Sequence, residues 1–311
     1  MPLNINTNSA ASTASYHLSK NNAALQKSLS RLSSGSRITQ PADDAGGLAV
    51  SMKLRGTISR MTGVEKNIDN ATSFLQVQDG VLESAGKIID RMAELKALSQ
   101  DVLKNSSDIA NYNAEFKNLQ VQLYQMSETK FNGVSLFATT DASGTKTTFN
   151  TVGSGNTVSI FTSATGESGS VVSMNKTSML AALTIDASSV STKKAFQDAA
   201  TANDEIRSFG AATVGAAFEL GEVSVAVFTQ ALQNVATLRA ENGGSVSRLQ
   251  FARESVTAQK TNLEAANGRI MDVDIASEST RLAKYNILVQ ASASMLSQAN
   301  SSSNVAMMLL N

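Results

Sequence analysis

The chain has 311 residues, a formal net charge of zero and no cysteine. Disulfide frameworks and thiolate metal sites are therefore excluded, and the balanced charge provides no basic surface for nucleic acid or an anionic membrane. Aromatic residues make up only 5% and tryptophan is absent, which argues against a large aromatic-lined ligand pocket. No apolar stretch is long enough to span a bilayer, so we expect no membrane insertion.

The N-terminal segment carries apolar residues at three- and four-residue steps or sums of these steps. Such spacing places a narrow apolar seam along one side of a helix, and a narrow seam is what a coiled coil buries. We predict a helix over residues 4–32, which Gly35 ends in the left-handed conformation. The N-terminal seam consists of Ala11, Ala14, Leu18, Leu25, Leu29 and Leu32.

A second, long helix is predicted to begin near Pro41. Proline suits the first helical turn, and the carboxylates of Asp43 and Asp44 complement the positive end of the helix dipole. Its apolar steps have one polar interruption at Gln78, and polar seam positions commonly fix helix register. The seam of this helix consists of Val64, Ile68, Ala71, Leu75, Gln78, Leu82, Ala85, Ile89, Met92 and Leu95.

The middle of the chain is rich in Ser, Thr and Gly and departs from the helical pattern. It follows a third predicted helix over residues 109–127. Residues 147–152 and 157–162 are predicted strands, joined by a hairpin turn at residues 153–156 (GSGN). A helical pattern resumes near Thr192.

The C-terminal half is again predominantly helical in pattern. Glycines interrupt the helix as far as Arg239, and residues 242–244 (NGG) are either a break or a tolerated weak point. Residues 271–274 are predicted to form a joint, followed by a last helix to about Met308. The C-terminal seam consists of Ile275, Leu282, Tyr285, Val289, Leu296 and Ala299.

Neither terminal helix can bury its seam alone, so we expect the two ends to pair with each other or with copies of the chain. The predicted fold is mainly α, with long coiled-coil-like helices from paired N- and C-terminal segments and a small β-hairpin insert. The predicted domains are residues 1–42 with 271–311, residues 43–137 with 190–270, and the β-rich insert 138–189. Such an arrangement is typical of assembly proteins rather than enzymes.

No group of residues points to catalysis or to a bound metal. Asp43 and Asp44 could form an acid–base pair, but no other titratable cluster accompanies them, and helix capping is the better interpretation. His17 is the only histidine and cannot complete a metal site. Asp272 and Asp274 lack the glycine and the terminal glutamate of an EF-hand loop. We therefore predict no catalytic residue, no metal and no cofactor.

Several ordered stretches resemble bacterial flagellins. The resemblance covers roughly residues 1–137 and 226–311, and the middle of the chain shows none. The matching stretches are INTN at 5–8, LSRLSSGSRI at 29–38, DDAGGLAV at 43–50, RMAEL at 91–95, TKFNG at 129–133, SRL at 247–249, RIMDVDIASE at 269–278, ILVQA at 287–291 and QAN at 298–300.

This resemblance implies a structural subunit of the extracellular flagellar filament, exported unfolded through the flagellar type III machinery without a cleaved leader. Terminal helices would form an inner tube, the next segments an outer tube, and the insert would lie on the surface. Expected partners are further copies of the chain, flagellar hook-junction and cap proteins, and an export chaperone on the C-terminal helix. The expected self-assembly seam is Leu18, Leu25, Leu29, Leu32, Leu282, Leu288, Val289 and Leu296.

The resemblance also suggests a contact with the vertebrate innate flagellin receptor through Arg91, Leu95 and Glu115. Asp90 stands where recognised flagellins often carry glutamine, and its carboxylate would compete for Arg91 or repel the receptor. The alternative is that Arg91 and Glu115 simply form polar contacts between helices.

Two other functions compete with that of a filament subunit. Flagellar hook–filament junction proteins have similar terminal helices, but they usually carry DDP where this chain has residues 43–45 (DDA), and residues 47–49 (GLA) favour flagellin. An enzyme within the insert is the other alternative. Residues 138–225 contain neither His nor Cys, which weighs against it.

Overall fold

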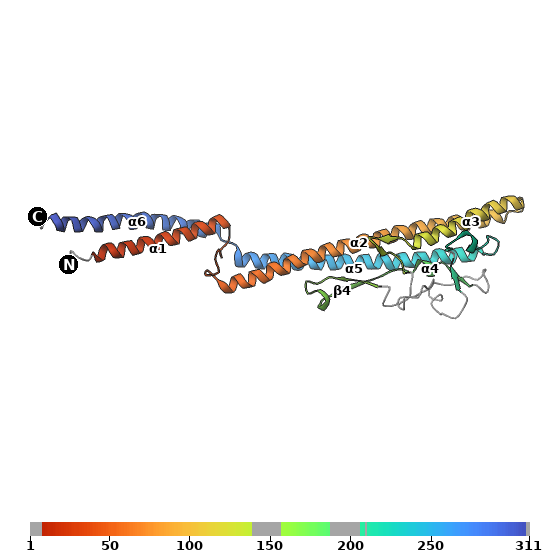
Figure 1. Ribbon diagram of the computed structural model, residues 1–311, viewed down its shortest axis with the longest axis horizontal. Coiled ribbons are helices and arrows are strands. Elements are labelled where there is room, and N and C mark those ends of the chain that lie inside the picture. The colour runs from red at the N-terminus through yellow and green to blue at the C-terminus, as the bar shows by residue number, and fades with distance from the viewer. Residues whose placement is uncertain (1–7, 139–156, 187–205, 209, 309–311) are drawn as a thin grey trace. The chain divides into compact units, whose positions relative to one another are not determined.

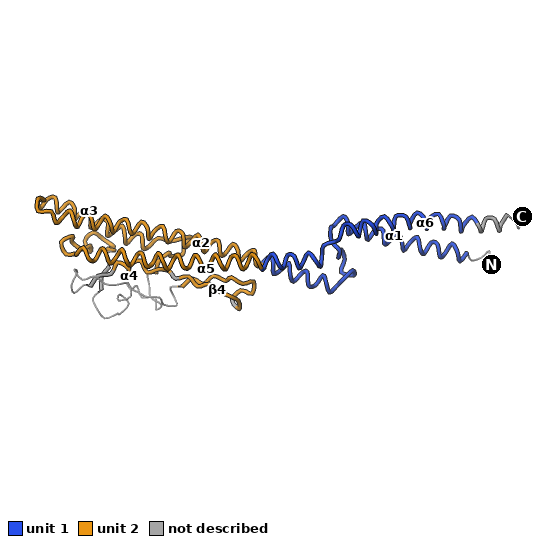
Figure 2. The backbone as a smooth tube through the Cα atoms, turned by 180° about the vertical axis from the view of Figure 1, so that it is seen from behind, with its two compact units in different colours: residues 1–59, 259–311 blue, residues 60–258 orange. Residues whose placement is uncertain are grey.

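The computed structural model of the chain divides into two compact units (Figure 2). Unit 1 comprises residues 1–59 and 259–311, and unit 2 comprises residues 60–258. The predicted three-part division, with boundaries near residues 42 and 271, stays a prediction. The structure describes residues 8–138, 157–186, 206–208 and 210–308.

The protein is mainly α, with long helices from both ends of the chain and a small β insert, as predicted (Figure 1). The long helices are α1 (Ser9–Ser34), α2 (Ala45–Ser99), α3 (Ser106–Ser127), α5 (Val225–Met271) and α6 (Ile275–Met308). The short elements are β1 (Lys130–Phe131), β2 (Val134–Ser135), β3 (Thr157–Phe161), η2 (Gly166–Ser168), β4 (Val171–Asn175), α4 (Met179–Ala182), β5 (Thr184–Asp186), β6 (Ile206–Ser208) and η4 (Val214–Ala216).

In unit 1, α1 and α6 lie side by side and antiparallel (Figure 1). Gly35 ends α1 with φ of 68°, the left-handed conformation predicted for it. The Gly35 carbonyl accepts a hydrogen bond from the Val273 amide at 3.0 Å, and the Arg37 amide donates to the Met271 carbonyl at 2.6 Å. The predicted joint at residues 271–274 is therefore present, and it is bonded to the connector that follows α1.

The start of α2 differs from the prediction, because the helix begins at Ala45 rather than near Pro41. The Asp44 side chain caps it, with Oδ1 accepting from the Gly47 amide at 2.8 Å. A Cβ atom on Gly47 would lie 2.5 Å from Asp44 Oδ2 and 3.0 Å from Ile38 Cδ1. Glycine at this position thus allows the cap and the buried Ile38 to approach the helix backbone together.

Unit 2 buries the predicted seam of α2. Every seam position from Val64 to Leu95 is buried, including the polar Gln78. Helix α5 runs antiparallel to α2, and Arg239 of α5 makes two hydrogen bonds to the Asp79 carboxylate at 2.9 and 3.0 Å. Helix α3 completes the core with Phe116, which packs edge-to-face on Phe228 of α5.

Buried amide side chains explain two polar positions within these helices. Gln78 Nε2 donates to the Leu136 carbonyl at 2.7 Å and to Thr177 Oγ1 at 2.9 Å, so this residue attaches the insert to α2. Asn242 Nδ2 donates to the Leu75 carbonyl at 2.8 Å. Helix α5 continues unbroken through residues 242–244, so this glycine-rich stretch is a tolerated weak point and not a break.

The insert contains one of the two predicted strands, paired with a strand that was not predicted. Strand β3 confirms the predicted strand at 157–162, and it pairs with β4 across the loop at 162–170. The other predicted strand at 147–152 and the turn at 153–156 lie outside the described residues. A further hairpin joins β1 to β2 through Asn132 and Gly133, whose φ angles of 49° and 81° suit a tight turn.

The helix predicted from Thr192 to Arg239 is wrong over residues 206–208 and 210–224. Residues 192–205 lie outside the described residues, β6 follows them, and α5 begins only at Val225. Tertiary hydrogen bonds hold the intervening chain in a non-helical path. The buried Gln120 side chain accepts from the Phe218 amide at 2.9 Å and donates to its carbonyl at 3.0 Å. Lys96 Nζ donates to the Leu220 carbonyl at 2.8 Å, and burial lowers the pKa of this amine.

Two leucines of α2 allow a matched test of this core. Leu82 is fully buried and Leu98 is exposed. Leu82→Ala should destabilise unit 2 by about 2–5 kcal/mol, because it removes buried apolar atoms and leaves a cavity. Leu98→Ala should change the free energy of unfolding of the monomer by less than about 0.5 kcal/mol. Urea unfolding monitored by circular dichroism measures both, and equal effects would contradict the described packing.

Candidate self-association surface

The terminal pair, α1 with α6, is held by few polar contacts. Asn8 Nδ2 donates to the Ala299 carbonyl at 2.9 Å, and Asn21 Nδ2 donates to Ser292 Oγ at 2.9 Å. Asn8 also caps α1 by accepting from the Ala11 amide at 3.0 Å. These bonds fix the antiparallel register of the two helices.

The predicted self-assembly seam is only partly covered by this pairing. Leu29 is 58% exposed, so it does not face α6. Along α1, and along α6 as far as Ser301, only Ser28 and Glu278 are buried. The remaining seam residues are all half-buried: Leu18, Leu25, Leu32, Leu282, Leu288, Val289 and Leu296. In one chain, the seam residues of the terminal pair therefore remain partly exposed to water, and none of them is fully buried.

A groove of about 700 Å³ runs between the two helices. Small side chains of α1, among them Ala10, Thr13 and Ala14, form one wall, and Leu288 and Met295 of α6 form the other. The neighbouring Ile287 is exposed on α6. An open apolar groove beside further exposed apolar residues is typical of a surface that another protein segment covers.

No chemistry beyond association is apparent in this groove. His17 lines it and is exposed, with its ring in edge contact with Tyr16. Within the described part of the chain, no three His, Cys, Asp or Glu side chains come close enough to hold a metal ion. No helix in the described ranges is both long enough and apolar enough to cross a membrane.

A partly buried ionic cluster connects α1, the connector and α6. The Asp43 side chain is only 8% exposed and lies 2.5 Å from Lys27 Nζ. The hydrogen bond from Lys27 holds the pKa of Asp43 well below its usual range, and bonds from Thr39 add to this effect against the cost of burial. Arg31 lies 4.0 Å from both Asp43 and the buried Glu278.

The sequence interpretation missed this cluster because it assigned Asp43 only to the dipole of the following helix. The available signal was the spacing of Lys27 and Arg31, which places two cations four residues apart on one face of α1. Their carboxylate partners, Asp43 and Glu278, are far apart in the sequence, so only the fold brings the four charges together.

The residues predicted to contact an innate receptor are not all available on the surface. Leu95 is 0% exposed, so the part of the prediction that placed it on a surface is corrected. Arg91 and Glu115 are exposed and bonded to each other, with Nε to Oε1 at 2.8 Å, and Arg91 also bonds Glu94 at 2.8 Å. The Glu115 bond raises the pKa of Arg91. Arg91 and Glu115 thus form a polar contact between α2 and α3, and receptor recognition stays a prediction.

Comparison with known proteins identifies the family. A family model of the bacterial flagellin N-terminal helical region matches residues 5–142, and one of the C-terminal helical region matches residues 225–310. The chain belongs to the bacterial flagellin family. It is therefore a structural protein of bacterial motility, a self-assembling subunit of the flagellar filament, and not an enzyme.

Relatives match over nearly the whole chain. The flagellin of Bacillus subtilis (strain 168) is 33% identical over 306 residues, covering 96% of each chain. The flagellar filament 30.7 kDa core protein of Treponema maltophilum is 29% identical over 311 residues, covering 98% of this chain and 99% of its own. The crystal structure of Bacillus cereus flagellin is 22% identical, with a TM-score of 0.41, and covers 65% of this chain and 94% of its own.

The ionic cluster predicts a specific pH dependence for unit 1. Because the pKa of Asp43 is lowered in the folded chain, its contribution to stability is present above the ordinary carboxyl pKa of about 4. That contribution is lost as the pH falls through the lowered pKa. Asp43→Asn should remove this acid-side dependence and increase amide hydrogen exchange in α1 at pH 7.

Asp44→Asn is the matched control, because asparagine also accepts a hydrogen bond at a helix N-cap. It should leave both the exchange rates of α1 and their pH dependence close to those of the parent. Equal exchange in the two variants would contradict the role given to Asp43.

Proposed function

We propose that the terminal pair is the surface through which this filament subunit assembles, and that it forms the innermost layer of the filament. The observation that carries the proposal is the half-covered seam along α1 and α6. Apolar surface that one chain leaves exposed to water gains free energy when other copies cover it. Leu288, Val289 and Leu296 would then become buried between subunits.

We also propose the three-part division for the assembled subunit. Residues 1–42 and 271–311 would form an inner tube, residues 43–137 and 190–270 an outer tube, and residues 138–189 a surface insert. The contrast in burial supports this division, because α2 buries its seam within one chain and α1 does not. A segment with its own core can pack as a preformed body, whereas the terminal pair depends on its neighbours.

Export unfolded through the flagellar type III machinery, followed by extracellular assembly, is the proposed route. A helix with exposed apolar residues such as Ile275, Ile287 and Met295 suits capture by an export chaperone before assembly. Hook-junction and cap proteins would then cover the same kind of surface at the two ends of the filament. Family membership supports this route.

The alternative of a hook–filament junction protein makes a different prediction about growth. A junction protein occupies a fixed place, whereas a filament subunit adds indefinitely to its own copies. Purified chain should therefore elongate filament fragments made of the same chain, as seen by electron microscopy. Addition that stops after one layer would favour the junction protein.

Truncating the seam should weaken assembly. Leu296→Ala should cost about 2–5 kcal/mol per subunit if the site is fully buried in the filament, and each 1.4 kcal/mol raises the critical concentration about tenfold. Val289→Ala should act in the same direction. The exposed Gln290 on the same helix provides the control variant Gln290→Ala. An unchanged critical concentration for both seam variants would contradict burial there.

Assembly should also protect the ends of the chain from proteases. In the monomer, the terminal pair has no dry core, so limited proteolysis should remove residues 1–40 and 271–311 before it cuts unit 2. In filaments the same sites should resist cleavage. Mass spectrometry of the fragments gives the order of cutting, and early cleavage within α2 of the monomer would contradict this order.

A further inference from the structure

An apolar tip stands at the turn between α2 and α3, at one end of unit 2. Val102 is 98% exposed and Leu103 is 92% exposed. Leu98 in the last turn of α2 and Ile109 in the first turn of α3 are also exposed. Together these four residues form what we call the apolar tip. They contribute little to the core of their own unit, and turns more often carry polar residues.

Specific hydrogen bonds order the turn that carries the tip. The Leu103 amide donates to Asp101 Oδ1 at 3.0 Å. Asn105 and Asp108 form a capping box at the start of α3, in which the Asp108 amide donates to Asn105 Oδ1 at 2.9 Å and the Asn105 amide donates to Asp108 Oδ2 at 3.3 Å. The apolar side chains therefore project from a hydrogen-bonded turn and not from a frayed helix end.

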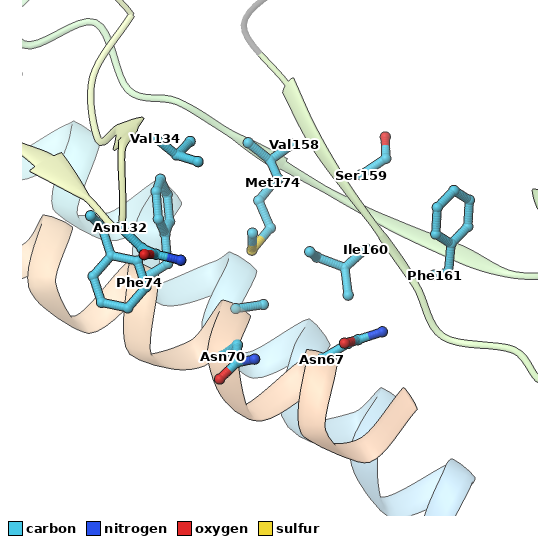
Figure 3. Close-up of a pocket in the computed structure, with 12 residues that line it drawn as sticks. Asn67, Asn70, Phe74, Asn132, Val134, Val158, Ser159, Ile160, Phe161 and Met174 are labelled. Carbon is cyan, nitrogen blue, oxygen red and sulfur yellow. The ribbon is translucent and has the colours of Figure 1, made fainter. Parts of the chain in front are cut away.

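An apolar pocket of about 500 Å³ lies elsewhere on unit 2, between α2 and the β insert (Figure 3). Its base includes the buried Phe74 and Met174, and the exposed Val134 and Phe161 stand at its rim. In Figure 3, Met174 and Ile160 point from the β3–β4 hairpin towards the helix that carries Phe74. The pocket is large enough to receive a pair of aliphatic side chains and is built mainly of apolar ones.

We propose that the apolar tip of one copy occupies the apolar pocket of the next copy. This contact deepens the proposed function, on which it rests, because it requires a filament of identical chains. Within one chain, residues 71 and 102 are separated by a helical path of about 45 Å, at 1.5 Å per residue. Tip and pocket therefore cannot meet in the same chain. A contact between two different surfaces repeats from copy to copy, and it generates an open helical assembly when the rotation between copies does not close a ring.

The charges around the two surfaces are complementary. Asp101 precedes the tip, and Lys66 and Lys130 each adjoin a lining residue of the pocket in the sequence. Neither lysine forms an ion pair within the described residues. Opposite charges around an apolar centre fix the orientation of a contact.

The natural absence of cysteine allows a direct crosslinking test. We would introduce Leu103→Cys and Val134→Cys into one chain, grow filaments under reducing conditions and then oxidise them. A disulfide needs Cα atoms within about 7 Å, so the two thiols can bond only between copies. Because each chain carries both partners, denaturing electrophoresis should show a ladder of covalent dimers, trimers and longer species. Phe161→Cys with Leu103→Cys tests the other side of the rim.

Three controls make the outcome specific. Leu103→Cys with Val77→Cys places the second thiol at an exposed position of α2 that does not line the pocket, and it should give no ladder. Leu103→Cys alone should stay monomeric, and dimers from it would mean that tips meet tips, which overturns the proposal. Filaments that form without a ladder in both rim variants also overturn it. If the cysteine-free parent forms no filaments, the proposed function fails instead.

A second variant tests the contact without crosslinking. Val102→Ser combined with Leu103→Ser changes only exposed side chains, so thermal unfolding of the monomer should match that of the parent. The critical concentration for filament growth should rise about tenfold or more, because two apolar side chains no longer leave water on assembly. Val77→Ser is the control at an exposed site away from the pocket. An unchanged critical concentration in the double variant would overturn the proposal.

Discussion

The structure depends on one constraint, which is that two paired helices cannot by themselves exclude water from all of their apolar seam residues. Each helix covers only one side of its partner, and among the described residues no third element closes the groove between them. Leu288 and Leu296 consequently remain half-buried, and Leu29 remains exposed. Unit 2 meets the same constraint within one chain, because α3 and the insert cover the seam of α2 and give it a core.

This difference explains how one chain can be both a folded protein and an assembly unit. Unit 2 has a core within one chain, represented by Phe116 packed on Phe228. The terminal pair has apolar surface that gains free energy only when copies cover it. Folding and polymerisation thus use the same hydrophobic driving force, in different parts of the chain and at different stages.

Polar and charged side chains of the helices hold the non-helical segments in place. Gln78, Gln120 and Lys96 hold segments of the insert and of the loop before α5 by hydrogen bonds to their backbone. Such bonds are strong where water is excluded, and leaving these buried groups unpaired would be costly. At the connector after α1, the charges of Asp43 and Arg31 have the same role, because they fix a non-helical segment to two helices.

The sequence alone determined the long helices, their apolar faces and the joint at residues 271–274, because a helical face repeats locally every three to four residues. It also indicated the family through ordered motifs, and the left-handed end of α1 at Gly35, which glycine adopts without steric cost. These features depend on residues that are close together in the sequence, so they can be predicted without knowledge of the tertiary structure.

Only the tertiary structure decided the features that depend on residues distant in sequence. The path of residues 210–224 depends on bonds from Gln120 and Lys96, and β3 pairs with the strand at 171–175, which the local pattern did not predict. Likewise, the charge cluster around Asp43 arises from the packing of helices. A local sequence pattern cannot predict these features, because the contacts that stabilise them join residues that are distant in the sequence.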